Sequence, residues 1–154
     1  EAAVADLREQ ILARLVTVCA GVTGIVSAAR NKLDVPLMSR PAVVIFGGAE
    51  LVLSPAPTLR ARTVPVMLMD LTPQIILLVR NDNDTESGPL MSLFRGRLVA
   101  AITGDATLLS LVTSNGFVRY EGCTEAEPTP ESKEPRLEIN VLFRYPLRLS
   151  DLAA

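Results

Sequence analysis

The sequence contains no histidine and no tryptophan, and its aromatic residues are two tyrosines and four phenylalanines. Histidine is the side chain best suited to proton transfer near neutral pH, and it is the commonest metal ligand. Its absence excludes hydrolase triads that use a histidine base and most zinc sites. A pair of carboxylates could still act as acid and base, as in glycosidases, but no tryptophan is present to stack on a sugar. We therefore expect no enzymatic activity, with a small carboxylate-dependent enzyme or ligand-binding domain as a remote alternative.

Sequence motifs for nucleotide and acyl chemistry are also missing. The chain has no phosphate loop of the GxGxxG or GxxxxGK[ST] type and no GxSxG serine motif. We therefore expect no cofactor. Lys and Arg total 15 and Asp and Glu total 17, which gives a net charge of −2, whereas nucleic-acid-binding domains are usually clearly basic. Lasting contact with phosphates is not expected to be the main task of this protein.

Only two cysteines are present, Cys19 and Cys123, and neither has the spacing of a CxxC pair or a metal site. Two positions alone do not establish a disulfide, and we favour free thiols in a reducing compartment. No run approaches the ~20 apolar residues of a membrane helix, and the charged residues before the first apolar run differ from a secretory signal. The prediction is a soluble intracellular protein without a membrane partner.

Apolar residues recur at helical spacing in three segments. Residues 3–20 carry them at every third or fourth position, and Gly21 follows as a helix stop signal. A second helix is predicted from Pro89 to Gly104, because proline fits the first turn of a helix and glycine ends one. Asp105 is then the expected N-cap of a short third helix.

Strand patterns lie on both sides of the central helices. Residues 25–30 predict a short strand, and residues 42–46 predict a strand that is buried on both faces and ends at Gly47. Residues 137–145 alternate apolar and polar side chains, as a half-buried strand does. We expect this segment to pair with residues 117–121 as a hairpin.

The segment from Arg62 to Arg80 holds two apolar runs on either side of Asp70–Pro73. These runs are predicted to be two antiparallel strands joined by a short turn. A sheet that is covered by helices on one side normally shows polar residues on the other. Here both faces are apolar, which indicates a subunit contact. The candidate subunit or tube interface consists of Arg62, Val64, Val66, Leu68, Ile76, Leu78 and Arg80.

Two polar segments, 81–88 and 125–135, are predicted to be flexible loops. The first has the sequence NDNDTESG, and its acids form the candidate lumen or tube-facing loop: Asp82, Asp84 and Glu86. Alternating acids also occur in calcium loops. However, the sixth and twelfth positions counted from Asn81 are not the glycine and glutamate of an EF-hand, so no metal is expected. The second segment, EAEPTPESKEP, has a composition typical of extended flexible chain.

The order of elements is a helix, several strands, two helices and two strands. This segregation of strands and helices favours an α+β fold. The prediction is a single α+β domain over 1–154, with a mostly antiparallel sheet and a C-terminal β-hairpin. The N-terminal helix and the central helix pair are expected to pack on one face of the sheet.

Several short segments of the chain occur together in one known family. They are Asp105–Leu109, Ser114–Gly116, Arg119–Cys123 and Phe143–Leu147, joined by the N-terminal helix, the strand end at Arg30-Asn31 and the strand entry at Pro41-Ala42-Val43. Through these residues the chain resembles the tail-terminator, or tail-completion, proteins of long-tailed bacteriophages and phage-like gene transfer agents. The resemblance covers nearly the whole chain in element order.

The resemblance implies a structural virion protein without catalytic residues, which assembles in the host cytoplasm as a ring, usually of six copies. Such a ring sits in the tail or neck, binds the last ring of the tail tube and stops its polymerisation. It also joins the neck or connector proteins. DNA passes through without specific binding, and an acidic lumen would suit this because it offers no cations to hold phosphates. The alternative is a neck or head-completion protein at the same junction.

Overall fold

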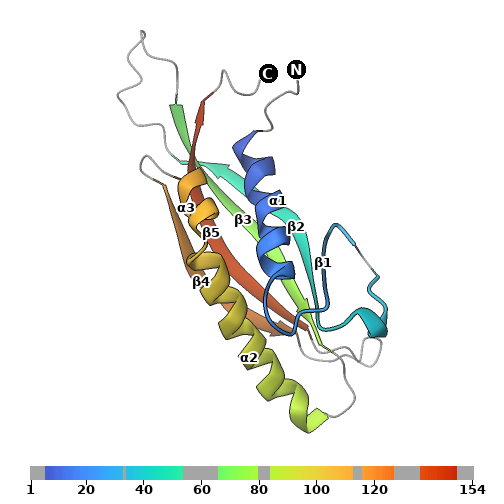
Figure 1. The fold of residues 1–154 in the computed structure, drawn as a ribbon. Coiled ribbons are helices and arrows are strands. Elements are labelled where there is room, and N and C mark those ends of the chain that lie inside the picture. The colour runs from blue at the N-terminus through green and yellow to red at the C-terminus, as the bar shows by residue number, and fades with distance from the viewer. Residues whose placement is uncertain are drawn as a thin grey trace, which may run out of the picture.

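The computed structural model describes residues 6–32, 34–53, 66–79, 84–112, 116–126 and 136–148. In this part of the chain, three α-helices cover one face of a five-stranded sheet with the strand order β1-β2-β3-β5-β4 (Figure 1). The pair β1–β2 is parallel, and the pairs β2–β3, β3–β5 and β4–β5 are antiparallel. The predicted α+β fold, with a mostly antiparallel sheet and helices on one face, is confirmed. The elements are α1 (Leu7–Ala20), β1 (Ser27–Arg30), the 3-10 helix η1 (Leu37–Ser39), β2 (Ala42–Val52), β3 (Val66–Leu78), α2 (Asp84–Thr103), α3 (Ala106–Leu111), β4 (Phe117–Ala126) and β5 (Arg136–Arg148).

Capping side chains set the ends of two helices. α1 follows Asp6, whose carboxylate accepts a hydrogen bond from the backbone N–H of Glu9, and it stops at Gly21. Asp105 caps α3 in the same way, by accepting from the backbone N–H of Leu108. The predicted stop and the predicted cap at Asp105 are confirmed. Residues 3–5 of the predicted first helix lie outside the described residues.

α2 begins earlier than the sequence predicts. The predicted flexible loop over 81–88 is wrong from Asp84 onward, because the helix already starts there and passes through Pro89. Two acids that the sequence assigns to this loop, Asp84 and Glu86, stand within the bounds of α2. These two residues therefore belong to a helix, while Asp82 lies outside the described residues.

The predicted hairpin between Arg62 and Arg80 is wrong, because its described part is one strand of 13 residues, β3. β3 lies at the centre of the sheet, between β2 and β5. The supposed turn, Asp70–Pro73, lies within this strand. Asp70 itself is paired with Leu51 on one side and with Arg144 on the other.

A β-bulge explains how a proline fits into the central strand. Pro73 has no N–H to donate, and proline within a sheet is normally confined to edges and bulges. Opposite it, the register of β2 shifts between Phe46 and Ala49, so Gly47 and Gly48 face a single residue of β3. The predicted strand end at Gly47 is therefore wrong, because the glycine pair forms the bulge and β2 continues beyond it.

The bulge reverses which side chains of β2 face the helices. Before it, Val43 and Ile45 lie in the main core beneath the helices. After it, Glu50 accepts a hydrogen bond from the hydroxyl of Tyr145, which belongs to that core, and Glu50 Oε2 lies 3.6 Å from Nε of Arg8 on α1. Burial raises the pKa of the Glu50 carboxyl, and the charge of Arg8 partly offsets this effect.

A second, smaller core lies on the other face of the sheet. There the segment 34–41, which connects β1 to β2, places Val35 against Ala42, Val44 and Leu78. Since Val43 and Ile45 belong to the main core, residues 42–45 are buried from both sides. This confirms the predicted two-sided burial, except that Phe46 is half-buried.

The C-terminal hairpin is confirmed, and its strands are longer than predicted. β4 runs on to Ala126, so the first two residues of the predicted loop 125–135 belong to a strand, and residues 127–135 lie outside the described part. Within the described residues, no helix combines the length and the apolar character needed to span a bilayer.

The bulge glycines provide a test of this architecture. Gly48 has φ +64°, and a Cβ there would lie 2.0 Å from the carbonyl oxygen of Thr72. Gly48→Ala is expected to lower the free energy of unfolding by about 2–4 kcal/mol, because left-handed strain and a backbone clash add. Chemical denaturation measures this. The control Gly96→Ala, where a Cβ meets nothing within 4 Å, should be stabilising by about 0.5–1 kcal/mol. Equal effects of the two substitutions would contradict the bulge.

Candidate interaction surfaces

The sheet face that looks away from the helices is the first candidate surface, and we name it the open face. Odd-numbered residues of β3 and β5 fill the main core, so their even-numbered residues point to the open face. Across one row, Leu51 of β2 pairs with Asp70, Asp70 with Arg144, and Arg144 with Phe117 of β4. This row crosses four strands and sets the chemistry of the surface.

The structure separates the predicted interface residues into two groups. Val66 is the first residue of β3, and three others lie further along this strand on the open face: Leu68, Ile76 and Leu78. Leu68 and Ile76 are roughly 26 Å apart along a strand, so they do not form one patch. The remaining residues lie outside the described part of the chain: Arg62, Val64 and Arg80.

One end of the open face is covered by the chain itself. Leu78 is buried against Val35 and Val44 in the second core, and Ile76 packs against the same cluster. The apolar character that predicted a subunit contact at Ile76 and Leu78 therefore has an intramolecular cause at this end. An interface on the open face would have to use the other end, near Leu68 and Leu51.

At that other end, a chain of contacts crosses three strands. Asp70 accepts hydrogen bonds from Nε and Nη2 of Arg144 at 2.8 and 3.0 Å, which raises the pKa of Arg144. The guanidinium carbon of Arg144 lies 4.7 Å from the ring centroid of Phe117, and that of Arg119 lies 5.0 Å from the same centroid. Arg119 also donates to Glu121 at 2.7 Å. Each of these charges therefore has an opposite partner.

The β2 end of this row carries an exposed apolar side chain. Leu51 is 66% exposed and stands next to Asp70 in the ladder. Cores of protein interfaces are poor in unpaired charge and rich in aromatic residues and arginine. We define the end of the open face that no other described segment covers as Leu51, Leu68, Asp70, Phe117 and Arg144, and we call it the uncovered end; it has that composition. Chemically, this end can pack against another protein surface.

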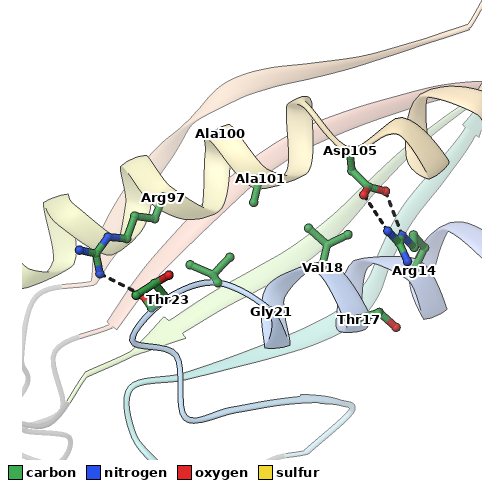
Figure 2. Close-up of a pocket in the computed structure, with 10 residues that line it drawn as sticks. Arg14, Thr17, Val18, Gly21, Thr23, Arg97, Ala100, Ala101 and Asp105 are labelled. Atoms are coloured by element: carbon green, nitrogen blue, oxygen red, sulfur yellow. Dashed lines mark hydrogen bonds and ion pairs between the residues drawn. The ribbon is translucent and has the colours of Figure 1, made fainter.

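The second candidate surface is a groove on the helix-covered side, between α1 and α2. It has a volume of about 650 Å³. Figure 2 shows Val18 and Ala101 facing each other across it, with one hydrogen-bonded arginine near each end. Small residues widen the groove, because Gly21 and Ala100 also line it. No local sequence pattern predicted this groove, because its walls come from residues about eighty positions apart.

Arginines close the groove at both ends. Arg14 donates to both carboxylate oxygens of Asp105, at 3.0 and 2.8 Å, and this contact lowers the pKa of Asp105. At the other end, Nη1 of Arg97 donates to the carbonyl oxygen of Thr23 at 2.9 Å, and its guanidinium lies 5.7 Å from the ring centroid of Phe94. Among the described residues, Arg97 forms no ion pair with a carboxylate. The groove thus combines an apolar floor with one positive charge that no acid of the described residues neutralises.

Both cysteines are free, as favoured from the sequence. Cys19 is buried on α1, and burial raises its pKa to about 12, so this thiol stays protonated at neutral pH and is a poor nucleophile. Cys123 is exposed on β4, and its hydrogen bond with Tyr120 raises the pKa of that phenol. Among the described residues, no three acids or cysteines are grouped as metal ligands.

No protein-family model matches this chain, and no curated protein matches it either.

The ion pair of the groove makes stability depend on pH. The pKa of Asp105 in the folded protein lies below its ordinary value of 3.8. Its stabilising contribution is therefore complete above 3.8 and is lost as the pH falls through the folded pKa. Asparagine keeps the cap of α3 but not the charge. We expect wild type to exceed Asp105→Asn in free energy of unfolding by a constant amount between about pH 5 and 7, and by less at lower pH.

Denaturant unfolding at several pH values measures this difference. Arg14→Met removes the partner, so a second substitution, Asp105→Asn, should add little pH dependence in that background. A wild-type advantage that persists unchanged down to about pH 2 would show that the ion pair does not perturb Asp105.

Proposed function

We propose that this protein is a non-enzymatic structural protein of a phage or phage-like particle, and that it forms a ring that terminates the tail tube. The observation that carries the proposal is the uncovered end of the open face. That surface is partly apolar, internally neutralised in charge and left bare by the helices. The segments that resemble tail terminators supply the biological context.

The geometry of the open face suits assembly. The contacts from Asp70 through Arg144 to Phe117 tie three adjacent strands together, so the surface is ordered before a partner arrives. A preordered surface loses less conformational entropy when it binds. Leu51 supplies apolar area that contact with a partner would remove from water.

Ring closure would explain how such a protein ends the polymerisation of the tail tube. A head-to-tail contact uses two different patches of each subunit, and it closes into a ring when the rotation between neighbours divides a full turn. One flat side of the ring then matches the last ring of the tube. The other side presents a different surface, so no further tube subunit is added and the connector proteins can bind there instead.

Deletion of the gene distinguishes this role from its alternative. A lost terminator leaves tube growth unchecked, so electron microscopy should show overlong tails of variable length. Tails of normal length beside unjoined heads would instead indicate a neck or head-completion protein. Complementation with the wild-type gene is the control for both outcomes.

The substitution Leu51→Lys tests whether the uncovered end of the open face takes part in assembly. Lysine at this position faces Asp70 across the strands, so the fold should keep its thermal midpoint while the apolar contact is lost. We expect rings to be absent or at least about tenfold weaker in sedimentation velocity and in negative-stain images. The control Leu90→Lys places the same charge on α2, where Leu90 is 38% exposed, and should leave assembly intact. If Leu51→Lys forms normal rings, the open face is not part of the interface.

A further inference from the structure

A head-to-tail contact joins two different patches of neighbouring copies, and two features of this chain that lie outside the uncovered end of the open face fit each other. The first is Met38 of η1, which is 88% exposed, the largest exposed fraction among the large apolar side chains that the structure describes. The second is the groove between α1 and α2. We propose that Met38 of one copy inserts into this groove of the next copy, an inference that rests on the proposed ring-forming function.

Met38 is held outward by a well-anchored turn. Val35 of the same segment is buried in the second core. Its carbonyl oxygen accepts hydrogen bonds from Nε and Nη2 of Arg40 at 3.3 and 3.0 Å, and Ser27 Oγ donates to the carbonyl oxygen of Ser39 at 2.8 Å. The turn is therefore fixed on both sides of Met38. Contact with an apolar surface would remove such an exposed apolar side chain from water, which is favourable in free energy.

Met38 cannot fill the groove of its own chain. Val35 of the segment 34–41 packs on the face of the sheet that looks away from the helices. η1 lies beside the β1 edge of the sheet, whereas the groove lies in the helix layer between α1 and α2 (Figure 1). A contact between the two features therefore joins different copies, and because the features differ, the contact is head-to-tail.

The groove suits a methionine in shape and chemistry. Its floor is formed by Val18, Val22 and Ala101, and the small residues Gly21 and Ala100 leave room beside them (Figure 2). Methionine is unbranched and flexible, so it fills irregular apolar hollows well. Among the other exposed large apolar side chains that the structure describes, Val26 precedes β1 and the rest lie on strands or α-helices, whereas Met38 sits on η1.

Charge complementarity supports the same pairing. Asp34, four residues before Met38 in the chain, is exposed and has no ion-pair partner among the described residues. In the groove, Arg14 already holds Asp105 with two hydrogen bonds, whereas Arg97 binds only a carbonyl oxygen and an aromatic ring among these residues. Arg97 is therefore the guanidinium that is available to the carboxylate of Asp34 from the next copy.

A mixing experiment tests the insertion. Met38→Glu removes the apolar side chain but keeps the groove, and Ala100→Leu fills the groove but keeps Met38. In sedimentation velocity up to about 1 mM, a concentration that reveals weak contacts, the wild type should associate and each variant alone should not. An equal mixture should form dimers and nothing larger, because one intact contact remains. Leu93→Glu, at another exposed leucine of α2, is the control and should associate like wild type.

Charge exchange tests the orientation. Asp34→Arg and Arg97→Asp should each weaken association by about tenfold or more, and the double variant should recover most of that loss. Thermal midpoints by circular dichroism check that each variant folds, which matters for Arg97 because it also binds Thr23. If Asp34 or Arg97 had only a structural role, the double variant would not recover association.

The outcomes separate this contact from the proposed function. If the wild type forms rings while Met38→Glu and Ala100→Leu do so equally well, the insertion is overturned and the ring-forming role stands. A mixture that stays monomeric beside an assembling wild type overturns it as well. If the wild type stays monomeric at about 1 mM and on isolated tail tubes, both proposals fail.

Discussion

The arrangement of side chains on the two faces of the sheet depends on the β-bulge that accommodates Pro73 in the central strand. Pro73 can donate no hydrogen bond to either neighbouring strand, and the structure places two glycines of β2 opposite it. Gly48 is needed there, because any side chain would meet the carbonyl oxygen of Thr72. The resulting bulge turns β2 over, so Leu51 points to the open face and Glu50 reaches the core tyrosine Tyr145. Without the bulge, the apolar side chain at the proposed interface would point towards the helices.

Paired arginine and carboxylate groups stiffen both layers. On the sheet, Arg144 joins β5 to Asp70 of β3, and on the helix side Arg14 joins α1 to Asp105 at the start of α3. Both contacts are bidentate and partly buried, which gives them more directional strength than isolated surface ion pairs have. Each one connects elements that are far apart in the sequence. Rigid surfaces result on both faces, and rigidity matters more for assembly than the strength of any single pair.

Short sequence patterns correctly predicted the structural features that are determined by neighbouring residues in the chain. The stripe of α1, the cap at Asp105 and the alternation of β5 each lie within one short window, and each is confirmed. The hairpin failed because Asp70–Pro73 has turn composition, and only glycines about 25 positions away in the chain make the proline acceptable in a strand. The two apolar faces of β3 were recognised, but the cover of Leu78 by Val35 required the folded chain. The groove was missed because α1 and α2 are not neighbours in the sequence.

The ion pairs of the arginines bear on what could pass through the proposed ring. A phosphate backbone is held when it releases counterions by pairing with free cationic groups. On the open face, Arg144 and Arg119 are occupied by Asp70 and Glu121, so a phosphate would have to compete with a carboxylate already in place. The net charge of −2 adds a weak general repulsion. A surface of this kind packs against protein more readily than it binds DNA, and this is what the proposed ring would need in order to contact its neighbours without holding DNA.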